Sequence, residues 1–425
     1  MNEISIVLPH KISILRDVKN QGIRWDKEEY SIYYRNIIYP YSEEYDIQIE
    51  CRYGKNLGHC WRLDNFENVE KKFSLTVKIY TACGVLAASK KCMIEIFGKK
   101  EHKNIKLLCI GDSMTMSETY IEQAANKARN VDTVGLRSVR SGVRHEGRGG
   151  WTCEAYFERY DDNGWGVSPF LFPKGCTGKD YFGSRTFWDK VSDPGHKTDY
   201  SYTGIQPQYI KDGMVCFDRG RLYRYSEGAY TEECADPEFG FSFKKYVERY
   251  LDCVPDAVSL LFGANEFQLC GYEELERELE RYIFMLKSMV ASIREYSRDI
   301  AVIICMPVCG GGQYAWGSRM GCSGSAKQYD FCIKAAGASI LRNFDCRRDE
   351  NIFICPMLAV CDPLSGFPRD MAKTNIYSEN MFSVNADWVH PSDAGYKQMG
   401  DAIAAVITDI RMNQNGDETA STKPW

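Results

Sequence analysis

The sequence lacks the features that mark membrane proteins, nucleic-acid binders and secreted proteins. Its apolar runs stay well below the about 20 residues that a membrane-spanning helix needs. Its formal net charge is -5, so charge gives no reason to expect a nucleic acid or an anionic membrane as a partner. The N-terminus lacks the basic, apolar and small-residue order of a secretory signal, and we therefore expect a cytoplasmic protein.

The 18 cysteines lack the spacing of a zinc site, because no CxxC pair occurs and the closest pair is Cys305 and Cys309. They are scattered through strand-like and helix-like segments of a chain without an export signal. We therefore expect reduced, mostly buried thiols rather than a disulfide framework, and no bound metal.

Residues 1–98 contain alternating runs rich in β-branched and aromatic residues, separated by Gly, Asn and Asp turns. The runs are SIYYRNIIY, YDIQIECRY, FSLTVKIYT and KKCMIEIF. This pattern predicts a small antiparallel β-sandwich as a first domain. The charged stretch GKKEHKNIK ends the pattern, and the polar residues 413–425 are expected to form a frayed tail.

Residues 104–412 alternate short apolar runs with helical patterns, which predicts a second domain of α/β class. The runs IKLLCIG, VDTVGL, DAVSLLFG, IAVIICMP and NIFICPML are too short and too β-branched for buried helices. They are typical of parallel strands that are covered on both faces. Such a doubly wound sheet collects its ligands at the carboxyl ends of the strands.

An aromatic-rich insertion at about 151–248 interrupts this alternation with little periodicity. So many aromatic residues argue against disorder, and a long aperiodic stretch inside a compact domain is usually functional. We expect about half of its rings to form a small core and the rest to be available to a ligand. The rings considered are Trp151, Tyr156, Phe157, Trp165, Phe170, Tyr181, Phe187 and Trp188.

Ser113 stands where the first predicted parallel strand ends, in the sequence CIGDSMTMS. A serine at this edge, at the start of a helix, gains neighbouring N–H donors and a favourable dipole, and is therefore a sensible nucleophile. Gly-Asp-Ser is also ordinary strand-to-helix capping chemistry. The tripeptide alone leaves both interpretations open.

A glycine and an asparagine follow the next two predicted strands. Gly150, in HEGRGGWT, allows a backbone N–H to approach a ligand closely, although a turn that needs positive φ explains it equally well. Asn265, in FGANEF, can direct its side-chain NH2 toward the same edge of the sheet, or it can simply cap a helix.

His390 is the one histidine of six that lies beyond the last predicted strand with a carboxylate three residues earlier. In the sequence DWVHP, Asp387 can reach the ring nitrogen that faces away from a substrate, which fixes the tautomer and stabilises the imidazolium. Pro391 suits the first position of the following helix. The alternative is a helix cap followed by a surface histidine.

Taken together, the four motifs resemble those of the SGNH (GDSL-type) hydrolases. The matching blocks are GDS at 111–113, the glycine of GGWT at 150, GAN at 263–265 and DWVH at 387–390. The resemblance covers roughly residues 105–410 and implies a flavodoxin-like three-layer α/β/α domain. The sandwich in front of it resembles the Ig-like modules that precede some bacterial esterases of this family.

The resemblance implies a role for each site residue. Ser113 would be the nucleophile, His390 the general base and then acid, and Asp387 its orienting partner. The oxyanion hole would comprise the backbone N–H groups of Ser113 and Gly150 and the side chain of Asn265.

The sequence departs from the family at two positions. Met114 replaces the common leucine, a change that nearly conserves volume, and Glu266 replaces the more frequent aspartate, which bears on the local loop geometry rather than on the chemistry. The further candidates for substrate contact are Asp112, Trp151, Glu266 and Trp388.

The resulting hypothesis is a serine esterase that removes O-acyl groups, most of all O-acetyl groups, from carbohydrates. Flat aromatic faces beside polar groups suit sugar rings, and the chemistry requires neither metal nor organic cofactor. One alternative is a lysophospholipase-like or thioesterase-like hydrolase with an acyl pocket formed by residues 267–269 and 309–316. Another is a non-catalytic sugar-binding protein on the same scaffold. The expected partner is a small-molecule or oligosaccharide ester, and the sequence leaves a homo-oligomer open.

Overall fold

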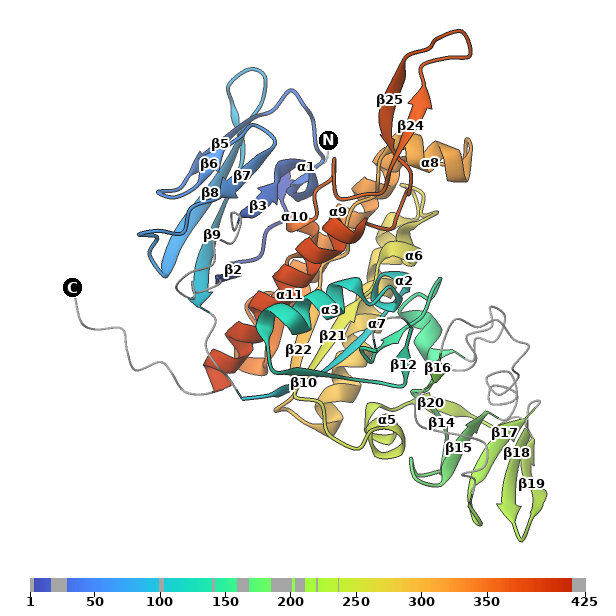
Figure 1. Cartoon of the computed structure of the whole chain (residues 1–425). Coiled ribbons are helices and arrows are strands. Elements are labelled where there is room, and N and C mark those ends of the chain that lie inside the picture. The colour runs from blue at the N-terminus through green and yellow to red at the C-terminus, as the bar shows by residue number, and fades with distance from the viewer. Residues whose placement is uncertain are drawn as a thin grey trace, which may run out of the picture.

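A parallel β-sheet forms the centre of the computed structural model in Figure 1. The structure describes residues 4–16, 29–98, 103–139, 142–158, 168–184, 201–202, 211–218, 221–235 and 237–414. The main strands are β10 (Ile105–Gly111), β11 (Val131–Val134), β21 (Ala257–Leu261), β22 (Ala301–Cys305) and β23 (Ile352–Cys355). Each lies inside one of the five apolar runs, as predicted.

These strands stand in the order β11-β10-β21-β22-β23, and every neighbouring pair is parallel. The first strand thus lies between the second and the third, which is the order of flavodoxin-like sheets. A short strand, β13 (Glu146–Gly147), pairs with the end of β10 beyond the stretch that β11 covers. It brings the segment that follows it to the carboxyl edge of the sheet.

Helices cover both faces of the sheet, which explains why its strands are apolar along their whole length. Helices α3 (Thr119–Ala128) and α11 (Asp393–Gln414) pack together on one face. Helices α7 (Leu275–Tyr296) and α9 (Ala326–Phe344) pack together on the other. All residues of β21 and β22 are buried between these layers.

The described residues of the front unit form three small sheets, of which the shortest pairs β1 (Ser5–Ile6) with β4 (Ile38–Tyr39). The other two have more strands. One has the order β2-β9-β8-β5, and the other β3-β7-β6. The strands are β2 (Lys11–Arg16), β3 (Tyr30–Tyr33), β5 (Asp46–Glu50), β6 (Lys55–Asn56), β7 (Cys60–Leu63), β8 (Lys72–Tyr80) and β9 (Leu86–Gly98). The prediction of an all-antiparallel sandwich is wrong for β2 and β9, which are parallel. Because no hairpin joins these two strands, nothing in the local sequence fixes their relative direction.

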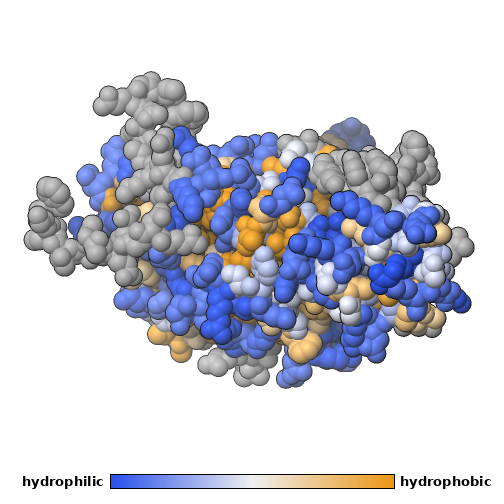
Figure 2. All heavy atoms as spheres, turned by 90° about the horizontal axis from the view of Figure 1, so that it is seen from below, coloured by the Kyte–Doolittle hydropathy of each residue, from blue (hydrophilic) through white to orange (hydrophobic). Residues whose placement is uncertain are grey.

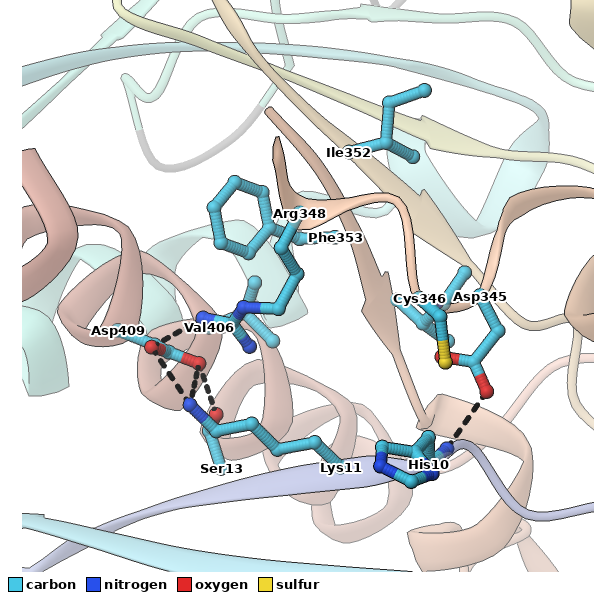
Figure 3. Close-up of a pocket in the computed structure, with 11 residues that line it drawn as sticks. His10, Lys11, Ser13, Asp345, Cys346, Arg348, Ile352, Phe353, Val406 and Asp409 are labelled. Atoms are coloured by element: carbon cyan, nitrogen blue, oxygen red, sulfur yellow. Dashed lines mark hydrogen bonds and ion pairs between the residues drawn. The ribbon is translucent and has the colours of Figure 1, made fainter. Parts of the chain in front are cut away.

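The front unit packs directly on the α/β part through β2 and α11. Asp409 of α11 accepts hydrogen bonds from Lys11 Nζ at 3.1 Å and Ser13 Oγ at 2.6 Å, and pairs with Arg348. Figure 3 shows these groups around a small pocket between the two parts. The apolar core runs without interruption from one part into the other.

The described parts of the insertion form small sheets and the helix α5 (Phe243–Tyr250). One sheet has the order β15-β17-β18-β19, with strands β15 (Tyr181–Ser184), β17 (Val215–Asp218), β18 (Arg221–Ser226) and β19 (Ala229–Ala235). A second pairs β14 (Leu171–Pro173) with β20 (Phe239–Phe241), and a third pairs β12 (Arg137–Ser138) with β16 (Ser201–Tyr202).

A hairpin of β24 (Arg369–Lys373) and β25 (Met381–Asn385) stands beside α8 (Gln313–Met320), at the top of Figure 1. The face of the molecule seen in Figure 2 is mostly hydrophilic, with an apolar area near its middle. None of the helices in the described ranges combines the length and the hydropathy that crossing a bilayer requires.

Candidate active site

Ser113 lies where β10 gives way to the short helix α2 (Ser113–Met116). The turn needs glycine at position 111, because an added Cβ would lie 2.2 Å from Thr115 Oγ1 and 2.5 Å from the Leu261 carbonyl oxygen. Asp112 caps α2 by accepting a 2.9 Å hydrogen bond from the Met114 N–H. The strand end and the cap together hold Ser113 at the carboxyl edge of the sheet.

The structure brings His390 and Asp387 to Ser113, as the sequence pattern predicts. His390 Nε2 lies 2.9 Å from Ser113 Oγ, although the two residues are 277 positions apart. On the other side of the ring, Nδ1 lies 3.3 Å from Asp387 Oδ2. The remaining carboxylate oxygen of Asp387 accepts the N–H groups of Val389 at 2.9 Å and His390 at 2.8 Å. The carboxylate therefore shapes the loop and orients the ring.

Two glycines after β22 allow this loop to approach. A Cβ on Gly311 would lie 2.1 Å from the Asp387 carbonyl oxygen, and a Cβ on Gly310 would lie 2.6 Å from that of Trp388. Gly311 also donates its N–H to the Trp388 carbonyl at 3.1 Å, and Asn385 donates to the Gly311 carbonyl at 2.7 Å. These two glycines were not singled out in the sequence, and their signal is the run CGGG directly after an apolar strand.

The ionisation of the site follows from these contacts. Burial raises the pKa of Asp387, but hydrogen bonds from the ring and backbone of His390 and from Val389 outweigh it and lower that pKa to about 2. Burial lowers the pKa of His390, but the hydrogen bond and charge of Asp387 outweigh it and raise that pKa above its ordinary value. Burial raises the pKa of Asp112 to about 7. An ionised Asp387 thus makes His390 a stronger base than free imidazole.

The segment around Gly150 is fixed on both sides. Arg148 donates its N–H to the carbonyl of Gly111, two residues before Ser113, at 2.9 Å. The Asn265 side chain donates to the Trp151 carbonyl at 2.9 Å. Gly150 lies between these anchors with φ of +78°, a conformation that favours glycine. The segment is thereby held between the strand that carries Ser113 and the loop that carries Asn265.

Asn265 lies in α6 (Ala264–Phe267), at the end of β21. Its side chain has two N–H groups, so one remains after the bond to Trp151. Gly263 begins the turn with φ of +125°, and a Cβ there would lie 2.8 Å from Pro307. Glycine is therefore required at position 263 for both space and backbone conformation.

Three of the four further candidates for substrate contact are buried or engaged inside the protein. Trp151 is 0% exposed, because its ring packs against Tyr156 with ring centroids 4.9 Å apart. Asp112 is 1% exposed and caps α2. Glu266 accepts the N–H groups of Cys153 at 2.6 Å and Gly263 at 2.9 Å, so its carboxylate is engaged inside the protein. Trp388 is half-buried and packs on Trp316, and its contact with substrate stays a prediction.

The aromatic rings in the described part of the insertion are mostly buried in a small core. Of the rings named above, Trp151, Tyr156, Phe170 and Tyr181 are buried, and Phe157 is half-buried. Phe170 stacks on Tyr246 of α5 with centroids 4.2 Å apart. Trp165, Phe187 and Trp188 lie outside the residues that the structure describes.

A buried polar network that sequence reasoning missed supports the Gly150 segment. Glu146 pairs with Arg148 at 2.9 Å and accepts the Tyr246 hydroxyl at 2.6 Å, and the Tyr156 hydroxyl donates to the Gly111 carbonyl at 2.8 Å. The other buried charged or titratable groups of this region are Glu118, Arg137 and His145. The only signal in the sequence is the pair of charges in HEGR, close to an apolar strand.

Metal ligands do not converge in the part of the chain that the structure describes: no three His, Cys, Asp or Glu side chains meet there as a group that could hold an ion.

Comparisons with known proteins give only distant likenesses. A family 3 carbohydrate esterase of Clostridium thermocellum is 13% identical with a TM-score of 0.37, covering 74% of this chain and 100% of its own. A carbohydrate acetylesterase family member from Sinorhizobium meliloti is 12% identical with a TM-score of 0.33, covering 72% and 98%. A lipase from a goat rumen metagenome is 10% identical with a TM-score of 0.33, covering 71% and 97%. No family profile and no curated protein matches the chain. The function must therefore be inferred from the site itself.

Proposed function

We propose that this protein is a serine hydrolase that cleaves O-acyl esters, preferentially O-acetyl esters of carbohydrates. The observation that carries the proposal is the 2.9 Å contact between Ser113 Oγ and His390 Nε2, with Asp387 on the far side of the ring. Nucleophile, base and orienting carboxylate in this order are the arrangement of acyl-transfer catalysis.

The reaction begins when Ser113 Oγ attacks the ester carbonyl carbon and His390 Nε2 takes the hydroxyl proton. The carbonyl oxygen becomes an oxyanion, for which the N–H groups of Ser113 and Gly150 and the free N–H of Asn265 are the proposed donors. The oxyanion collapses, the imidazolium gives its proton to the leaving alcohol, and an acyl-serine remains. Water activated by His390 then releases the acid and restores Ser113.

Burial of three apolar side chains in the segments considered for an acyl pocket favours a short acyl group over a long one. Phe267, Cys309 and Trp316, from the segments considered for an acyl pocket, are 0%, 5% and 2% exposed and pack in the core. They are therefore unavailable to line a pocket for a long chain.

Exposed aromatic rings beside the Asp387 loop favour a sugar as the alcohol. Tyr314 of α8 and Phe382 of β25 are 51% and 44% exposed and meet edge to face with centroids 6.2 Å apart. Tyr314 follows Gly311 and Phe382 precedes Asn385, and a hydrogen bond from the Asn385 side chain to the Gly311 carbonyl joins these two segments. Exposed rings on segments joined to the Asp387 loop are suited to the apolar faces of pyranose rings.

The proposal is tested by measuring acetate release from acetylated mono- and oligosaccharides, beside p-nitrophenyl esters of increasing chain length. We expect activity on acetyl esters that Ser113→Ala abolishes. Ser288→Ala should leave this activity intact, because Ser288 is a half-buried helix serine whose hydroxyl bonds within its own helix, to the Phe284 carbonyl. A fluorophosphonate probe should label the wild type and fail to label Ser113→Ala. Activity confined to long-chain esters would favour the lysophospholipase-like or thioesterase-like alternative. Absence of both hydrolysis and labelling would leave the sugar-binding alternative.

A further inference from the structure

The two loops that supply the proposed oxyanion donors are far apart in the sequence. Residues 148–153 follow β13, and residues 263–265 follow β21. Neither loop lies in a strand or in a long helix that would fix its position. The distance between the Gly150 N–H and the Asn265 side chain therefore depends on direct contacts between the loops.

Glu266 makes one of these contacts and at the same time closes its own turn. Its Oε1 accepts the Cys153 N–H at 2.6 Å, and its Oε2 accepts the Gly263 N–H at 2.9 Å. One carboxylate thus joins the first residue of one loop to the last residue of the other. The neighbouring Asn265 adds the 2.9 Å bond to the Trp151 carbonyl.

The opposite end of the Gly150 loop is already fixed, because Arg148 donates its N–H to the Gly111 carbonyl at 2.9 Å. The loop that contains Gly150 is therefore held at one end by the strand that leads to Ser113 and at the other end by Glu266. Cys153 is 1% exposed, so water does not readily replace the carboxylate if it is removed.

We propose that Glu266 is a positioning residue that sets the separation of the two oxyanion-donor loops and does not contact the substrate. The inference rests on the function proposed above. It explains why a longer acidic side chain stands directly after Asn265: an aspartate carboxylate lies about 1.5 Å closer to its own backbone and cannot hold both N–H groups at these distances.

Two variants test the proposal by different means. Glu266→Gln keeps the size of the side chain but turns an NH2 group toward one of the two N–H donors. Glu266→Asp keeps the charge but shortens the reach. Because a displacement of about 1 Å at a reacting group can cost 100-fold, we expect kcat to fall by about 10- to 100-fold in both variants. The KM for an acetyl ester should stay within about twofold, since oxyanion donors act on the transition state more than on the bound ester.

Asp256→Asn is the matched control, because Asp256 accepts the Lys106 N–H at 2.7 Å at the opposite edge of the same sheet. It removes a carboxylate that binds backbone N–H, but far from Ser113. All variants are compared in the full chain for kcat, KM, melting temperature and the rate of fluorophosphonate labelling.

The outcomes separate this inference from the proposed function. A loss of kcat and of labelling rate in both Glu266 variants, without a matching loss in Asp256→Asn, supports the inference. Wild-type kcat in either Glu266 variant overturns it and leaves the function standing, as does a rise in KM with unchanged kcat. A wild type that neither hydrolyses esters nor reacts with the probe overturns both.

Discussion

Asp409→Asn should weaken the joint between the front unit and the α/β part, because Asp409 is the shared partner of Lys11, Ser13 and Arg348. The Asp409 side chain is 2% exposed, and removing one partner of a buried ion pair typically costs about 3–5 kcal/mol. Lys11 and Arg348 retain 20% and 33% of their side-chain exposure, so water recovers part of the loss. We expect a cost of about 2–3 kcal/mol in the free energy of unfolding.

Calorimetry should show this loss as a melting temperature lower by roughly 2–3 °C, because an unfolding entropy of about 2.1 cal/mol/K per residue gives about 1 °C per kcal/mol for a chain of this length. Asp401→Asn is the control on the same helix. Asp401 pairs with Lys127 at 35% side-chain exposure, and its loss should cost less than about 1 kcal/mol.

The effect should depend on pH in a known direction. Burial raises the pKa of Asp409, but Arg348, Lys11 and Ser13 outweigh it and bring that pKa below its ordinary value. Its contribution to stability is therefore complete above the unfolded-state pKa of about 4 and disappears as pH falls through the lower folded-state pKa. The difference between wild type and Asp409→Asn should shrink in that acid range. Equal melting temperatures at pH 7, or an equal loss in Asp401→Asn, would refute the reasoning.

Three further predictions concern the site. Because Asp387 raises the pKa of His390, wild-type activity should begin to fall on acidification already above pH 6.5. Asp387→Asn should shift this acidic limb of the pH–rate profile to lower pH and reduce kcat by about 10,000-fold. An unchanged pH–rate profile would contradict the assigned pair. Gly311→Ala should reduce kcat by about 100-fold, because the added Cβ would displace the Asp387 carbonyl. Gly317→Ala is the control and should keep the wild-type kcat, because a Cβ at position 317 meets open space. Equal kcat values in the two variants would show that the loop adapts. Asn265→Ala should lower kcat by about 100- to 1,000-fold and leave Ser113 able to react with the probe, and a loss below threefold would remove this side chain from the proposed oxyanion hole.

The sheet could be predicted from the sequence because its signal is local. Runs such as AVSLL and AVIIC are apolar throughout, since both faces of the strand are covered, and this pattern survives without knowledge of the partners. The edge of the sheet follows from strand direction, and so the meeting of Ser113 with His390 could be predicted as well. The catalytic roles of these residues stay predictions.

The remainder depends on contacts that no local pattern records. The parallel pairing of β2 with β9 is decided by packing between segments far apart in the chain. Trp151 and Glu266 were expected to contact substrate because they flank the motifs. Their side chains instead turn inward to Tyr156 and to the N–H groups of Cys153 and Gly263. Proximity in sequence to a functional residue does not say which way a side chain points.

Helix α11 begins three residues after His390, and its flank carries strand β2 of the front unit. A shortened chain that retains only the α/β part would expose this side of α11 to solvent. Asp409 would also lose its partners Lys11 and Ser13. We therefore expect that removing the front unit yields a protein that self-associates. A shorter variant is better made by removing residues from the insertion.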